Sequence, residues 1–163
     1  VAITFAVIGG FVWGWLADRF GPKRTLNWVL MCWVAIFMFA AAIGIAGLPL
    51  LALYAVASAA GFALGGVWSA DRPYMLRLTP PSRVGEFYGL YGMVGRFSAI
   101  TGPLIWAGMA HITITTIGLE PHVGQGYGVL ALLVLVVIAF FILQPVTDER
   151  RDWKALQAGA AEP

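Results

Sequence analysis

Gly14-Trp15-Leu16-Ala17-Asp18-Arg19-Phe20-Gly21-Pro22-Lys23-Arg24 joins two long apolar runs. This stretch contains four charged side chains and two glycines, whereas the segments on either side carry almost no charge. A soluble core would not flank such a cluster with two runs of this kind. Short cytoplasmic loops between membrane-spanning helices, in contrast, are where Lys and Arg accumulate. The stretch therefore predicts a polar connection between two transmembrane helices.

The composition of the chain is that of an integral membrane protein. Of its 163 residues, 60% are hydrophobic and only 11% are charged. A soluble domain carries roughly 25% charged residues, so this deficit excludes an ordinary soluble fold. The single cysteine, Cys32, lies within an apolar run. The sequence therefore predicts neither a disulfide framework nor a cysteine-based metal site.

Five apolar segments predict an all-α integral membrane fold with five transmembrane helices. They cover residues 1–17, 25–43, 49–70, 87–110 and 127–144. A helix needs about 20 apolar residues to cross about 30 Å of hydrocarbon. The first segment is slightly short and begins without a methionine, which favours a helix that starts before this sequence. We expect residues 1–146 to form a partial transmembrane repeat and residues 147–163 to form a cytoplasmic tail.

The positive charges predict how these helices are oriented. All Lys and Arg residues except Arg96 lie in the first connection, in or beside the third connection, or in the C-terminal tail. The second connection has no charge, and the fourth has only Glu120 beside His122. The positive-inside rule then places the chain's N-terminus outside and its C-terminus in the cytoplasm. We expect the bacterial inner (plasma) membrane as the location.

The first polar connection has a specific spacing of glycines and charges. Gly21 permits a tight turn, and Gly14 allows another helix to approach closely. The pattern resembles the loop signature of the major facilitator superfamily, with a departure at Pro22, where a basic residue is usual. The resemblance implies a cytoplasmic gate built from Gly14, Asp18, Arg19, Gly21, Lys23 and Arg24. The alternative is a basic loop that only sets topology.

A second resemblance extends from residue 65 to residue 104. Its elements are Gly65-Gly66-Val67, Arg72, Tyr74, Arg77-Leu78, Pro80, Gly85-Glu86-Phe87-Tyr88-Gly89-Leu90-Tyr91, Arg96-Phe97-Ser98-Ala99-Ile100 and Gly102-Pro103-Leu104. This pattern is similar to the major facilitator subfamily related to vacuolar amino-acid effluxers of autophagy, with departures at Trp68, Asp71 and Pro73. The resemblance implies that the five helices are helices eight to twelve of a twelve-helix transporter. Five helices cannot enclose a central cavity, so it also implies a missing N-terminal repeat or a second membrane chain as partner.

The fourth apolar segment carries the one charge expected near the middle of the membrane. Arg96 lies about 15 Å inside the start of the segment, where a guanidinium requires a cavity or a partner. Two interpretations are about equally supported. Arg96 either lines a transport pathway and binds an anionic group, or forms a structural pair with a carbonyl or carboxylate. Small residues in this segment and just before it, together with a Gly-Pro hinge, predict close packing and bending: Gly85, Gly89, Gly92, Gly102 and Pro103.

Charged residues around the third connection predict an ion-pair network on the cytoplasmic side. Its members are Asp71, Arg72, Arg77 and Glu86. A substrate site is the alternative for Asp71. In the same segment, Gly61 and Gly65 form a GxxxG pair, which predicts close helix packing.

Two functions are compatible with this sequence. The first is part of a secondary active transporter that moves a small polar solute, anionic or amino-acid-like, by alternating access. The alternative is a non-transporting scaffold or accessory subunit of a larger membrane complex. No segment has a carboxylate at its centre, so a proton-coupling carboxylate would have to lie elsewhere. No enzyme motif is present, and we expect no catalytic residue, cofactor, metal or nucleic acid. Lipids, a small solute and further helices are the expected partners.

Overall fold

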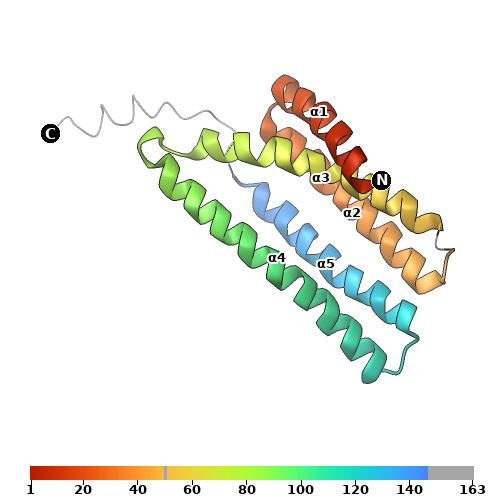
Figure 1. The fold of residues 1–163 in the computed structure, drawn as a ribbon. Helices are drawn as coiled ribbons and strands as arrows, with labels where there is room; N and C mark the ends of the chain where they lie inside the picture. Colours follow the sequence, from red (N-terminus) through yellow and green to blue (C-terminus); the bar gives the residue numbers. More distant parts are fainter. Residues whose placement is uncertain (50, 147–163) are drawn as a thin grey trace.

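The computed structural model describes residues 1–49 and 51–146 as five long helices joined by short turns (Figure 1). The predicted cytoplasmic tail, residues 147–163, lies outside the described residues. No strand occurs among the residues described, so the all-α prediction is confirmed. The helices are α1 (Ala2–Phe20), α2 (Pro22–Ala46), α3 (Leu51–Leu78), α4 (Val84–Thr115) and α5 (Pro121–Leu143), with a short 3₁₀ turn η1 (Pro81–Arg83) before α4.

Helices α2 to α5 are each long and apolar enough to cross a membrane. Helix α1 has 19 residues, which corresponds to about 28 Å at the rise of an α-helix. It corresponds to the apolar segment that the sequence predicts to be short. Among the described residues, four of the five predicted spans therefore have the length and hydropathy to cross a membrane, and α1, the shortest of the five helices, does not.

The helices lie side by side in the order α1, α3, α2, α5, α4, which differs from their order in the sequence. Figure 1 shows α3 and α4 joined at one end by η1 and separated along the rest of their length by α2 and α5. Helix α2 packs on α3 and on α5, so it lies at the centre of the row. Its Val29 and Thr25 are among the fully buried side chains of the chain.

Glycines bring α1 and α3 into backbone contact. A Cβ atom on Gly61 would lie 2.1 Å from the Ala2 carbonyl oxygen, and one on Gly65 would lie 2.2 Å from the Ala6 carbonyl oxygen. The Ser69 hydroxyl donates a hydrogen bond of 3.0 Å to the Gly10 carbonyl. The contacts advance along both helices in the same direction, so α1 and α3 are parallel. Small residues at this spacing allow such an approach in membranes.

Three alternating glycines place α5 between α2 and α4. A Cβ atom on Gly126 would lie 3.1 Å from the Ala41 carbonyl oxygen in α2, and one on Gly128 would lie 2.8 Å from the Trp106 carbonyl oxygen in α4. Gly124 also packs against α4. Successive helical residues are about 100° apart, so Gly124 and Gly128 share one face and Gly126 lies on the opposite face.

All five helices extend beyond one or both ends of their apolar segments, and the extension at a single end is longest in α3 and α5. Helix α3 continues from the predicted end of the third segment at Ala70 through Asp71, Arg72 and Pro73 to Leu78. Helix α5 begins at Pro121, before the predicted start of the fifth segment at Tyr127. Proline fits the first turn of α5 because the amide there has no partner within the helix. Hydropathy locates the part of a helix that lies in hydrocarbon, whereas helical hydrogen bonding continues into the interface.

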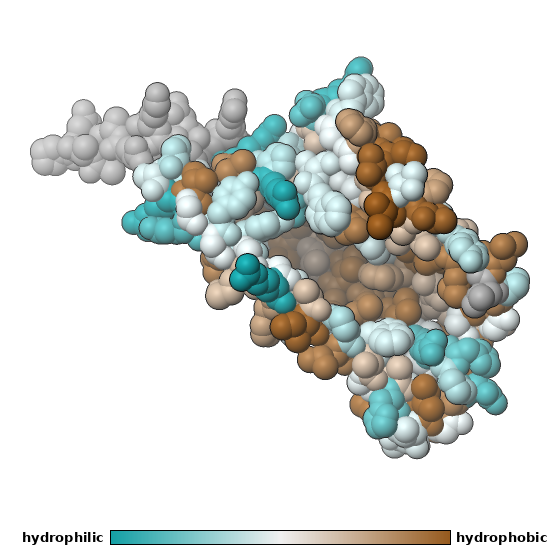
Figure 2. All heavy atoms as spheres, viewed as in Figure 1, coloured by the Kyte–Doolittle hydropathy of each residue, from teal (hydrophilic) through white to brown (hydrophobic). Residues whose placement is uncertain are grey.

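Much of the apolar surface remains uncovered within this chain. Only 11–22% of the residues in the apolar windows of α2 to α5 are buried. Figure 2 shows a recess between α3 and α4 whose floor is formed by hydrophobic atoms. The exposed faces fit contact with lipid or with further helices rather than with water.

Candidate functional site

In the structure, α1 and α2 are joined by a single residue, Gly21, and the rest of the first polar connection is helical. Gly21 lies between α1 and α2 with φ 90°, a conformation that favours glycine, and its amide donates to the Ala17 carbonyl at 3.0 Å. Pro22 begins α2, and the fully buried Thr25 donates its hydroxyl to the Gly21 carbonyl at 3.0 Å. The turn is therefore rigid, and it fixes the directions in which the charged residues around it project.

The charged residues of this turn have different surroundings. Asp18, Arg19 and Arg24 are exposed, and the Arg19 guanidinium lies 5.4 Å from the centre of the Trp15 ring. Within residues 1–49 and 51–146 the carboxylate of Asp18 has no hydrogen-bond or ion-pair partner. A Cβ atom built on Gly14 would lie 4.0 Å from the Ser69 Oγ, which is an ordinary van der Waals contact. The close approach to α3 occurs nearer the start of α1.

Lys23 connects the same turn to the end of α5. Its Nζ donates to the carbonyl oxygens of Gln144, at 2.9 Å, and of Val146. The Gln144 amide in turn donates to the Asn27 side-chain oxygen at 3.1 Å. A cation at the carbonyl end of a helix is stabilised by the helix dipole. Lys23 therefore caps α5, a role that its position in the sequence does not indicate.

Asp71 lies within α3 and contacts α4. One of its carboxylate oxygens accepts a hydrogen bond from the Tyr91 hydroxyl, and the other accepts from the Arg72 backbone amide at 2.6 Å. The Arg72 side chain also interacts with the Tyr91 hydroxyl. Where the sequence predicts cationic partners for Asp71, the structure gives it a phenol. No spacing in the sequence signals this bond, because it depends on how α3 and α4 are rotated.

Two other members of the predicted cytoplasmic network, Glu86 and Arg77, lie in the terminal turns of α4 and α3. Glu86 is exposed in the first turn of α4, where the helix dipole stabilises a carboxylate. Arg77 is half-buried in the last turn of α3. Among the described residues, neither Asp71 nor Glu86 forms an ion pair. For Asp71, the structure shows the bond to Tyr91, and the network of four residues stays a prediction.

Arg96 is exposed on α4, and the part of the chain that the structure describes gives its guanidinium no hydrogen-bond or ion-pair partner. The small residues of the same helix are equally uncovered. A Cβ atom built on any of the four predicted packing glycines would have nothing within 4 Å. These glycines are Gly85, Gly89, Gly92 and Gly102. Pro103 lies within the helix. The close packing predicted for this face therefore has no counterpart within the described chain.

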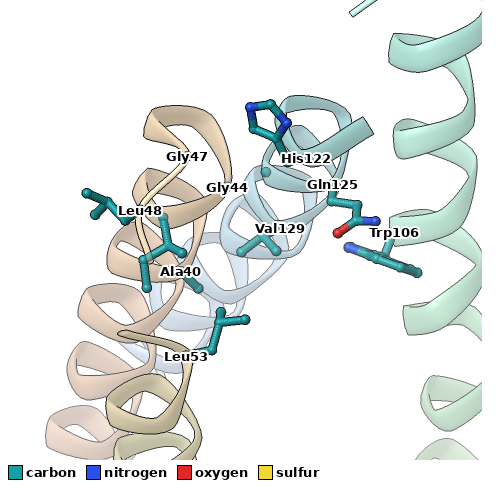
Figure 3. A pocket seen from close by; sticks show the side chains of 11 residues that line it. Ala40, Gly44, Gly47, Leu48, Leu53, Trp106, His122, Gln125 and Val129 are labelled. Atoms are coloured by element: carbon teal, nitrogen blue, oxygen red, sulfur yellow. The ribbon is translucent and has the colours of Figure 1, made fainter. Parts of the chain in front are cut away.

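A cavity of 510 Å³ lies at the other end of the bundle (Figure 3). Its walls come from α2, α3, α4 and α5 and are mainly apolar, with Gly44 and Gly126 in the floor between α2 and α5. His122 and Gln125 of α5 and Trp106 of α4 supply its polar groups. Sequence reasoning missed this cluster and the glycines of α5. The alternation Gly-Gln-Gly-Tyr-Gly at residues 124–128 is the signal that could have indicated a helix packed on both sides.

The profile of the Major Facilitator Superfamily matches residues 1–161. The chain belongs to the major facilitator superfamily. It is 29% identical over 154 residues to an uncharacterised MFS-type transporter, YxiO, of Bacillus subtilis, covering 91% of this chain and 31% of that protein. It is 28% identical over 167 residues to autophagy-related protein 22 of Coccidioides immitis, covering 96% of this chain and 26% of that protein. No solved structure matches the chain.

These matches confirm the family predicted from the two motifs. The chain spans about a third or less of the length of these curated relatives. Major facilitator relatives and four membrane-length helices identify it as an integral membrane protein. They point to transport rather than to catalysis.

Proposed function

We propose that this chain forms part of a secondary active transporter that moves a small polar solute by alternating access. Anionic and amino-acid-like solutes are the first classes to test. The observation that carries the proposal is the superfamily match over almost the whole chain. Arg96 supports the anionic class of solute, because an exposed guanidinium within an apolar helix can bind an anionic group with two parallel hydrogen bonds.

Helices outside this chain complete the transporter in this proposal. They belong to an N-terminal repeat or to a second membrane chain, and they cover the recess between α3 and α4. The support is the low burial of α2 to α5 and the open space beside the glycines of α4. The exposed Asp18, Arg19 and Arg24 would face the same partner at the cytoplasmic gate. The proposed setting is a bacterial inner membrane, with the C-terminus in the cytoplasm.

Uptake by proteoliposomes tests the role of Arg96. The protein expressed from its whole reading frame is reconstituted and assayed with labelled anionic solutes and amino acids. We expect Arg96→Ala to abolish uptake and Arg96→Lys to retain a substantial part of it, since lysine keeps the positive charge. Arg83→Ala is the control, because Arg83 is exposed in η1. Wild-type uptake in both Arg96 variants would contradict a pathway role.

The mass of the native gene product separates transport from the alternative of a scaffold subunit. A product close to the full length of the relatives supports a transporter that contains both repeats. A product of 163 residues that purifies within a larger assembly would favour the accessory subunit.

A further inference from the structure

The first half of α4 is weakly attached to the rest of the chain. None of residues 84–102, here called the α4 arm, is buried, and most are exposed. The buried residues of α4, Ala110 and Thr113, lie beyond Pro103. Trp106, which packs over Gly128 of α5, also lies beyond it. Helix α4 is therefore anchored to α5 by its second half.

The α4 arm joins that anchored half at a point where the helix is weakened. Pro103 has no amide hydrogen, so it cannot donate to the carbonyl of Ala99, and its ring crowds that carbonyl. Gly102 precedes it and has nothing within 4 Å of a built Cβ atom. Sharp bends in helices occur at such positions. The geometry gives the arm a pivot at Gly102–Pro103.

A polar bond holds the α4 arm against α3. The Tyr91 hydroxyl donates to Asp71, and the Arg72 side chain interacts with the same hydroxyl. Both bonded residues are half-buried. Asp71 lies between Ala70, which is fully buried, and the buried Tyr74, so it is part of a helix face that is fixed by packing. Elsewhere, apart from the turn at η1, α3 and α4 share hardly any direct contact.

We infer that Tyr91 and Asp71 form a latch between α4 and α3, and that opening it lets the α4 arm pivot at Gly102–Pro103. Arg96 lies on the arm between the latch and the pivot, so the movement changes where its guanidinium points. Tyr91 and Asp71 are thus positioning residues for Arg96. This last step rests on the proposed function, whereas the latch and the pivot rest on the geometry of α3 and α4 alone.

Spin-label distances in the whole protein test the latch. Labels are placed at the exposed positions Phe87→Cys on the arm and Ile142→Cys on α5, with Cys32→Ser as background. A change of roughly 10° in the bend at Pro103 would move residue 87, about 24 Å away, by about 4 Å. We expect Tyr91→Phe, which removes only the hydroxyl, to broaden or shift the distance distribution. We expect Tyr88→Phe, whose ring packs edge-on against Tyr91, to leave it unchanged.

A second variant tests the pivot. Pro103→Ala restores the helical hydrogen bond, so in the Tyr91→Phe background it should return the distribution toward wild type. Wild-type distances in Tyr91→Phe would overturn the latch, and an unaltered broad distribution in the double variant would overturn the pivot. Because distances are measured without solute transport, a working latch in a protein that transports nothing would contradict the proposed function alone.

Discussion

Gly65 shows how a missing side chain holds two helices together. A Cβ atom at this position would lie 2.2 Å from the Ala6 carbonyl oxygen and 2.5 Å from the Gly10 amide nitrogen. Both atoms belong to the α1 backbone and cannot rotate away, so Gly65→Ala must push α1 off α3. We expect a loss of about 1–3 kcal/mol and a melting temperature lower by roughly 2–4 °C per kcal/mol, measured by thermal unfolding in detergent.

Gly89→Ala is the matched control for that substitution. It makes the same chemical change in a helix, but nothing lies within 4 Å of a Cβ atom built on Gly89. Alanine is favoured over glycine in a helix by about 1 kcal/mol, so within this chain the variant should be neutral or slightly more stable. An unchanged melting temperature in Gly65→Ala would contradict the backbone contact. A loss at Gly89 would instead indicate a helix from outside this chain on α4.

The contact of Lys23 with the end of α5 leads to a further prediction. The last turn of α5 leaves carbonyl oxygens without partners within the helix, and the Lys23 ammonium binds two that follow it, those of Gln144 and Val146. Lys23→Met keeps the length of the side chain and removes the charge. We expect several-fold faster amide hydrogen exchange in the last turn of α5, measured by mass spectrometry, because that end can fray.

Arg24→Met serves as the control for this helix end. It removes a neighbouring positive charge, but Arg24 is exposed and bonds to no described residue. Exchange in α5 should therefore stay at the wild-type rate. Faster exchange in both variants would mean that the total charge at the turn, rather than the contact of Lys23, holds the end of α5.

The helices could be predicted from the sequence more fully than the contacts between them. Their number, their type and the turn at Gly21 follow from hydropathy and glycine spacing, and the structure agrees with these. The end of α3 did not follow, because Asp71 and Pro73 end the apolar segment but not the helix. The bond between Asp71 and Tyr91 could not follow either, since it depends on the relative rotation of two helices joined by a turn.

At the scale of the molecule, the row of helices presents more apolar surface than five helices can cover. The recess between α3 and α4 has a hydrophobic floor from α2 and α5 (Figure 2), and the end of the recess away from η1 contains the cavity lined by Trp106 and Gln125 (Figure 3). Hydropathy predicts which segments enter the membrane, but a residue that faces lipid and one that faces a missing helix are equally apolar. The sequence therefore could not predict the position of the recess.

The orientation of the whole bundle is tested by the two turns that border α4. Ser82 in η1 lies beside Arg83, whereas Glu120 precedes α5 in a connection without Lys or Arg. By the positive-inside rule, Ser82→Cys should face the cytoplasm and Glu120→Cys the outside. With Cys32→Ser as background, an impermeant maleimide should label Glu120→Cys in intact spheroplasts, and Ser82→Cys only after permeabilisation. The reverse pattern would invert the topology, and labelling of both in intact spheroplasts would mean that α4 does not span the membrane.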